Sequence, residues 1–331
     1  MTERPALPAA VAAAVAAGLT EEGVRIVRHA VYEDGAICLA DADMLFAVLA
    51  AVGDGRCPKW PELFVEAMAD IMVDQVEPHG YVSKANADWL IGRMRGDDRV
   101  LRSTEFAALI AVIEKARSIP DALAAFALGL VHDAIVSGNG LLGPAGVQGT
   151  VTAADTAALR TILHAASSEG FGFITRAEAE ALFAIADATA GRDNDPGFDD
   201  LFARAVGNHL IAAGGRHPPT VNEALHRERW LDQRQTTAQG VGRFFARSLS
   251  AVISGDAFTA CTGGWVADRA ADGFMQNAVQ AISEGEARWV VERITRDGTV
   301  SSAETRLLAF IRDDGAPVPA VMRPLIERIA A

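Results

Sequence analysis

One acidic stretch of the sequence carries residues that could hold a divalent cation. Hard cations such as Ca²⁺ and Mg²⁺ prefer carboxylate and amide oxygens. The candidate ligands follow one another within a short segment, Glu178, Glu180, Asp187, Asp193 and Asp195. The same acids could instead start helices, because Asp195 stands before a proline and Asp199 and Asp200 would fall in the next first turn. Both interpretations stay open: a calcium or magnesium site in a metal-binding or sensing protein, or ordinary helix capping.

A His-Asp pair suggests a second kind of chemistry. His132 and Asp133 resemble the pair used by an all-helical family of metal-dependent phosphohydrolases, which also need an upstream histidine at the metal. His79 could supply that ligand, although it lies in a Pro-His-Gly sequence typical of a turn. The alternative is a histidine near a helix end, stabilised there by the helix dipole.

The segment from about residue 213 to 281 has the composition of a docking surface. Between 214 and 247 it holds six arginines against two glutamates and one aspartate, in a chain of net charge −13. The residues expected to contact a partner are basic and aromatic: Arg229, Trp230, Arg243, Phe244, Phe245 and Arg247. Such a face suits a protein partner or an anionic membrane surface. The alternative is that the segment folds back over the join between two halves of the chain.

The composition favours a globular helical protein. Half of the 331 residues are hydrophobic, 22% are charged and only 6% are aromatic. The negative net charge argues against general nucleic-acid binding, which requires a basic surface. The three cysteines, Cys38, Cys57 and Cys261, show no CxxC spacing, so they predict neither a disulfide framework nor a zinc site and suit a reducing cytoplasm.

Apolar residues recur at helical spacing along the chain, and strand patterns are nearly absent. The spacing predicts helices over 22–31, 41–51, 61–74, 84–94, 104–116 and 121–136. Residues 5–18 are small and apolar, and we interpret them as a first surface helix. No apolar run reaches the roughly 18–20 residues that a membrane span requires.

Two parts of the chain repeat each other. Residues 82–94 align without a gap on 282–294, so that Trp89 and Arg93 recur as Trp289 and Arg293. Further pairs of similar blocks occur in the same order in both halves: 41–47 with 178–184, 63–67 with 201–205, and 29–30 with 164–165. A duplication predicts a first helical domain over 1–137, a Gly-rich linker over 138–150, and a second helical domain over 151–331 that contains the insertion.

Four turns between helices share one pattern, at Asp34–Ile37, Asp97–Val100, Gly170–Ile174 and Asp297–Val300. A Gly or Asp can take the left-handed conformation that ends a helix, and a branched residue two positions later should enter the core. Capping boxes then start the next helix, as at Thr175 with Glu178. EF-hand calcium loops are an alternative, but none of the four turns supplies enough oxygen ligands.

The turn pattern, Asp-Gly, one residue, Ile or Val, Ser or Thr, two residues, Glu, resembles the tellurite-resistance TerB-like family of all-helical domains. The resemblance implies a compact helical domain in each half, a link to stress responses and no established enzymatic activity; the chain departs from it at Asp98 and Cys38. We therefore expect an all-α protein of two tandem helical bundles with EF-hand-like turns. The expected function is a cytoplasmic, non-enzymatic scaffold that docks a protein partner through 213–281, with metal binding and HD-type phosphohydrolysis as alternatives.

Overall fold

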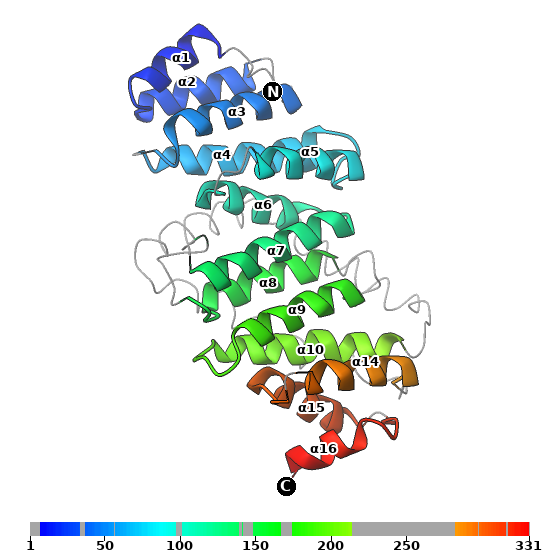
Figure 1. Ribbon diagram of the computed structural model, residues 1–331. Coiled ribbons are helices and arrows are strands. Elements are labelled where there is room, and N and C mark those ends of the chain that lie inside the picture. The colour runs from blue at the N-terminus through cyan, green and yellow to red at the C-terminus, as the bar shows by residue number, and fades with distance from the viewer. Residues whose placement is uncertain are drawn as a thin grey trace. The chain divides into compact units, whose positions relative to one another are not determined.

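The computed structural model describes most of the chain outside the 214–281 region. The described residues are 7–33, 37–55, 57–96, 101–138, 141, 148–166, 174–213, 282–296, 298–315 and 317–330. They form thirteen α-helices and one π-helix, and no strand occurs among them (Figure 1). The predicted all-α fold is therefore confirmed. Within these residues no helix is both long enough and apolar enough to cross a membrane.

The chain divides into two compact units. Unit 1 comprises Met1–Ala145 and Ala158–Glu169, and unit 2 comprises Gly146–Ala157 and Gly170–Ala331. The division after residue 145 falls inside the predicted Gly-rich linker. Helix α8 (Ala153–Ala166) contributes its first residues to unit 2 and the rest to unit 1, whereas the sequence repeat places all of it in the second half.

Unit 1 is a stack of helices that follow one another in chain order (Figure 1). They are α1 (Ala9–Ala16), α2 (Glu21–Tyr32), α3 (Leu39–Val52), α4 (Lys59–Asp70), the π-helix η1 (Ile71–Gln75), α5 (Lys84–Arg95), α6 (Ser103–Lys115) and α7 (Asp121–Ser137). Helix α4 lies at the centre, because it packs against α2, α3 and α6. Its side chains Trp60, Leu63, Phe64 and Met68 are fully buried, at the i, i+3, i+4 and i+8 spacing of an inward helix face.

Unit 2 contains α9 (Arg176–Ala188), α10 (Pro196–Ala213), α14 (Glu284–Thr295), α15 (Ser302–Asp314) and α16 (Arg323–Ala330). Helix α10 packs against α9, α14 and α15, and Phe198 and Phe202 on it are fully buried. Gly207 permits a close approach of α10 to α15, because a Cβ atom added there would lie 2.5 Å from Cδ1 of Phe310.

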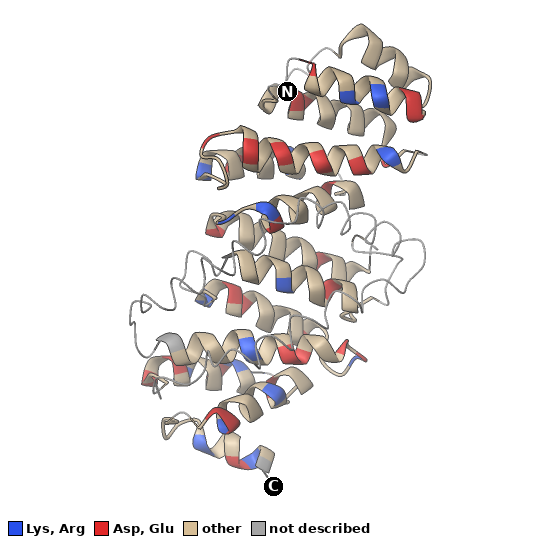
Figure 2. Cartoon of the chain, turned by 180° about the vertical axis from the view of Figure 1, so that it is seen from behind, with Lys and Arg blue, Asp and Glu red and all other residues tan. Residues whose placement is uncertain are grey.

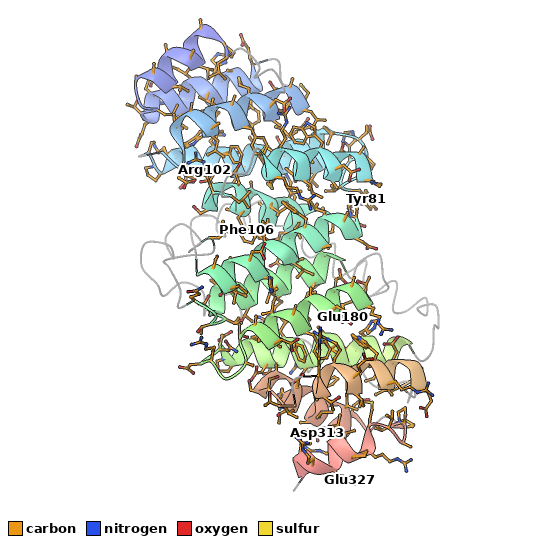
Figure 3. All side chains as sticks on the ribbon, in the orientation of Figure 1. Tyr81, Arg102, Phe106, Glu180, Asp313 and Glu327 are labelled. Carbon is orange, nitrogen blue, oxygen red and sulfur yellow. The ribbon has the colours of Figure 1, made fainter. Side chains whose placement is uncertain are left out.

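Acidic residues cap the N-termini of five of these helices in the same way. The carboxylate at the third helical position accepts the backbone N–H of the residue before the helix, at 2.7–3.0 Å. The pairs are Cys38 with Asp41, Arg102 with Glu105, Thr152 with Asp155, Thr175 with Glu178, and Ser301 with Glu304; Figure 3 labels Arg102 at the start of α6. The two capping boxes predicted at Thr175 and Ser301 are confirmed, since both hydroxyls also accept the returning amide.

The shared turns lie mostly outside the described residues. Residues 34–36, 97–100, 170–173 and 297 are not described, and the corresponding predictions are untested there. Ile37 and Ile174, the branched residues of two turns, are buried as expected, with 6% and 7% of their surface exposed. Gly298 has the predicted left-handed backbone, with φ of 77°.

The capping carboxylate of α9 should contribute measurably to stability. Glu178 is buried and receives the Thr175 N–H at 2.7 Å, so we expect Glu178→Ala to lower the free energy of unfolding by about 1–2 kcal/mol. Glu178→Gln keeps an acceptor oxygen and should lose less. Urea denaturation followed by circular dichroism measures both. Equal stability of the alanine variant and the wild type would contradict this role for Glu178.

Candidate functional site

A group of charged and aromatic side chains in unit 2 is built on α14. The Ser283 hydroxyl accepts the Glu286 N–H and begins the helix, and the four-residue spacing of Trp289 and Arg293 turns both toward α9. The Trp289 indole N–H donates to Glu180, which Figure 3 labels on α9. The Trp289 ring meets Phe183 edge to face, with centroids 5.7 Å apart.

Arg293 joins two acids of α9. Its Nε lies 3.2 Å from Oε2 of Glu180, and its Nη2 donates to Oδ2 of Asp187 at 3.1 Å. The guanidinium carbon also lies 5.0 Å from the centre of the Phe183 ring, within the range of a cation–π interaction. Only 9% of the Arg293 side chain is exposed, so the charge is held in place by paired carboxylates and an aromatic face.

A second group of polar side chains also lies against Trp289. His209 of α10 contacts the Ile174 carbonyl through Nδ1 at 2.7 Å, and its Nε2 lies 3.6 Å from Oε2 of Glu286. Arg176 lies 3.8 Å from Glu286 and 4.6 Å from the Trp289 ring centre. We call the whole set the Trp289 cluster: Trp289, Arg293, Glu180, Asp187, His209, Glu286 and Arg176.

Unit 1 contains a related but simpler arrangement on α5. Trp89 meets Phe46 of α3 at 6.1 Å, and Phe46 meets Phe64 of α4 at 5.3 Å. Arg93 pairs with Asp43 at 2.7 Å. Burial raises the pKa of the Asp43 carboxyl, and the Arg93 charge opposes that rise.

The aromatic contacts of unit 2 follow the same order. The ring centroids of Phe183 and Phe202 lie 4.9 Å apart, and those of Phe202 and Phe198 lie 6.2 Å apart. The last pair corresponds to Phe64 and Trp60 in unit 1, whose centroids lie 5.9 Å apart. In both units a tryptophan, on α5 or on α14, therefore ends a chain of aromatic rings. The repeated Trp and Arg are visible in the sequence, but no pattern in the sequence marked them as a site.

The structure gives partners to the carboxylates of three of the five predicted metal ligands. Glu178 caps α9, Glu180 and Asp187 bind Arg293, and the backbone of Asp195 receives Phe198 N–H at the start of α10, as the capping alternative predicted. Asp193 is exposed. No group of three or more His, Cys, Asp or Glu side chains that could hold a metal ion occurs in the part of the chain that the structure describes. Calcium or magnesium binding stays a prediction.

Asp199 and Asp200 connect α10 to α15. The Ser302 hydroxyl donates to Asp199 at 3.2 Å, and Arg306 Nε donates to Asp200 at 2.7 Å. Burial raises the pKa of the Asp199 carboxyl, and the Ser302 hydrogen bond opposes that rise. Asp199 lies in the first turn of α10 and Asp200 directly follows it, near the helix N-terminus as predicted, and each also contacts α15.

The side chains of His132 and Asp133 contact each other. Nδ1 of His132 lies 3.0 Å from Oδ1 of Asp133, and 77% of the Asp133 side chain is exposed. His79, the proposed additional ligand, lies 3.1 Å from Glu77. The hydrolase interpretation stays a prediction. The proposed docking residues, Arg229, Trp230, Arg243, Phe244, Phe245 and Arg247, lie outside the described residues.

A row of acids along α4 and η1 was not among the sites predicted from the sequence. Glu62, Glu66, Asp70 and Asp74 recur every four residues, and Figure 2 shows acidic residues along α4. Arg28 donates to Glu66 at 2.6 Å, and Lys115 pairs with Asp74. Burial raises the pKa of Asp70, and burial together with the nearby acids raises the pKa of Tyr32 to about 12. The four-residue spacing was the signal that could have revealed the row.

Comparisons with known proteins add no family to this geometry. No family model matches the chain, and neither the curated proteins nor the solved structures gave a significant match.

Proposed function

We propose that the chain is a non-enzymatic interaction scaffold, made of two copies of one helical unit, that docks a protein partner through the 213–281 insertion. The observation that carries the proposal is the recurrence of one set of contacts in both units. In each, a tryptophan on α5 or α14 packs on a phenylalanine of α3 or α9, and an arginine one turn later pairs with an acid of that same helix.

The backbone supports the duplication independently of these side chains. Gly53 and Gly191 occupy corresponding places before α4 and α10, and both have left-handed backbones, with φ of 66° and 72°. Pro58 and Pro196 follow each glycine at the same separation, and Phe64 and Phe202 follow each proline at the same separation. A glycine with positive φ at matched positions is expected when one unit has been copied.

The helix starts support a TerB-like unit. Thr175 with Glu178 and Ser301 with Glu304 form the Ser/Thr and Glu pairs of the family's turn pattern, and the carboxylates bind the preceding backbone amides. Cys38 departs from the pattern, but Asp41 still receives its backbone N–H at 2.9 Å. These contacts assign the acids of the pattern to starting helices.

The position of the insertion supports its docking role. In unit 1 the corresponding helices are joined by the short connection 76–83, whereas in unit 2 α10 and α14 are separated by 214–283. Long insertions in helical repeat units commonly carry binding residues, because the stacked helices already supply the core. The excess of arginine in 214–247 and its aromatic residues fit an acidic or mixed protein surface.

Affinity capture tests the proposal. We expect the full chain to retain a protein partner, and a triple variant with Arg229, Arg243 and Arg247 replaced by glutamine to retain at least about tenfold less, since interface arginines commonly dominate binding energy. The matched control replaces the same three residues by lysine, which preserves the charge. Deletion of 214–281 should abolish capture while far-UV circular dichroism stays helical. Undiminished capture by the deletion variant would refute docking through the insertion.

A further inference from the structure

We propose that His209 and Glu286 share one proton and form a pH-sensitive contact that ties the end of α10 to the start of α14. The two residues lie on either side of the 214–281 segment along the chain, His209 in the last turns of α10 and Glu286 in the first turn of α14. The inference goes beyond the proposed scaffold role, because it describes a conformational control that unit 2 has whatever its partner is.

The hydrogen bond to the backbone fixes one proton of the imidazole. Nδ1 of His209 lies 2.7 Å from the Ile174 carbonyl oxygen, and because a carbonyl only accepts, this nitrogen carries a hydrogen. In the neutral ring, Nε2 would then present a lone pair. It lies 3.6 Å from a Glu286 carboxylate oxygen, and neither atom has a hydrogen-bond partner among the described residues. A second proton removes this conflict, because it turns facing acceptors into a charged pair.

The charged neighbours favour placing that proton on the histidine. Arg176 of α9 lies 3.8 Å from the other Glu286 oxygen and stabilises an ionised carboxylate. Beyond the Trp289 ring, Arg293 is balanced by Glu180 and Asp187. Only 12% of the His209 side chain and 17% of the Glu286 side chain are exposed. Hydration therefore compensates little for two acceptor atoms that face each other without a proton between them.

The corresponding residues of unit 1 make no such pair. In the register of the proposed duplication, Ile71 stands in place of His209, Asn86 in place of Glu286 and Leu39 in place of Arg176. Ile71 is fully buried, and the Asn86 side chain donates to the Glu77 carbonyl at 3.1 Å. The titratable pair is therefore specific to the unit that carries the insertion.

The expected dependence on pH follows from the shared proton. An imidazole in an unfolded chain titrates near about pH 6.5. While the pair holds the proton, the imidazolium and the carboxylate form a charged contact that stabilises the packing of α14 on α10. When a rise in pH removes the proton, the contact between His209 and Glu286 weakens, because the Nε2 lone pair and the carboxylate oxygen repel each other. Mild acid should therefore tighten the α10–α14 contact, and mild alkali should loosen it.

Hydrogen exchange of peptides covering 282–296 in the full-length protein tests the inference, with rates corrected for the intrinsic effect of pH. A double-mutant cycle of His209→Gln and Glu286→Gln isolates the contact at pH 5.5 and at pH 8. We expect His209→Gln to speed exchange at least about fivefold at pH 5.5, with a much smaller effect at pH 8. The matched control, His132→Gln, alters an exposed His-Asp pair of unit 1 and should leave 282–296 unchanged.

Coupling between the two substitutions that is present at pH 5.5 and reduced at pH 8 would support the shared proton. Coupling that is equal at both pH values, or absent at both, would overturn it. Because exchange in 282–296 is measured without any partner, this result is independent of the capture experiment. A scaffold that binds its partner through 213–281 can lack the proton-controlled contact, and the contact can exist in a protein with another function.

Discussion

Replacing Trp289 with alanine is expected to lower the free energy of unfolding of unit 2 by about 3–5 kcal/mol, the usual range for removing a large buried aromatic side chain. Only 6% of Trp289 is exposed. Its ring contacts Phe183, the side chains of His209 and Arg176 lie against it, and its N–H donates to Glu180. The substitution would remove the aromatic centre of the Trp289 cluster and leave the Glu180 carboxylate without this donor.

Denaturant titration, with hydrogen exchange to separate the two units, measures this effect. Trp289→Phe keeps much of the ring area and loses the indole donor, so it should be less destabilising, by about 1–2 kcal/mol relative to wild type. Trp89→Ala is the matched change in unit 1, and its effect should be smaller because Trp89 is only partly buried. An alanine variant at 289 that unfolds like the wild type would contradict a central role for this ring.

Replacing Arg293 with methionine is expected to lower the stability of unit 2 by about 2–3 kcal/mol. Breaking a buried ion pair typically removes 3–5 kcal/mol, because the remaining charge stays desolvated. Here the remaining acids keep access to water, since 43% of Glu180 and 40% of Asp187 are exposed, and the loss should be smaller. Methionine preserves most of the apolar stem of Arg293, so the measured loss reports mainly on the guanidinium, including its contact with the Phe183 ring.

The matched substitution in unit 1 is Arg93→Met. Arg93 pairs with one acid, Asp43, and 33% of its side chain is exposed, so its loss should lower stability by about 1 kcal/mol or less. Raising the salt concentration should reduce the Arg93 effect more than the Arg293 effect, because solvent ions screen the more exposed pair. Equal effects at both positions would show that burial does not set the strength of these pairs.

The local signals of the sequence were sufficient to predict the helices. All six ranges predicted from apolar spacing contain a helix, and residues 9–16 form the expected first one. The capping boxes at Thr175 and Ser301 were also predictable, because their donors and acceptors lie within four residues of each other. Contacts over such short separations depend on local backbone geometry, which residue type largely determines.

The contacts that the acidic side chains make could be identified only from the tertiary structure. From the sequence, Glu180 and Asp187 were candidate metal ligands, with helix capping of the acidic stretch as the alternative. Their partner is Arg293, which lies more than 100 residues away in the chain and reaches them because α14 packs in unit 2 beside α9. Similarly, the four-residue row from Glu62 to Asp74 is visible in the letters, but its pairing with Arg28 and Lys115 depends on the packing of α4 against α2 and α6.

The sequence by itself determined that the chain is helical, where six helical segments of its first half lie, and that a Trp and an Arg recur in both halves. Only the tertiary structure decided which charges meet, because an ion pair or a shared proton requires atoms a few ångströms apart and burial that keeps water from competing. His209 and Glu286 illustrate the difference: the 214–281 segment separates them in the chain, and the packing of α10 against α14 brings their side chains within 3.6 Å.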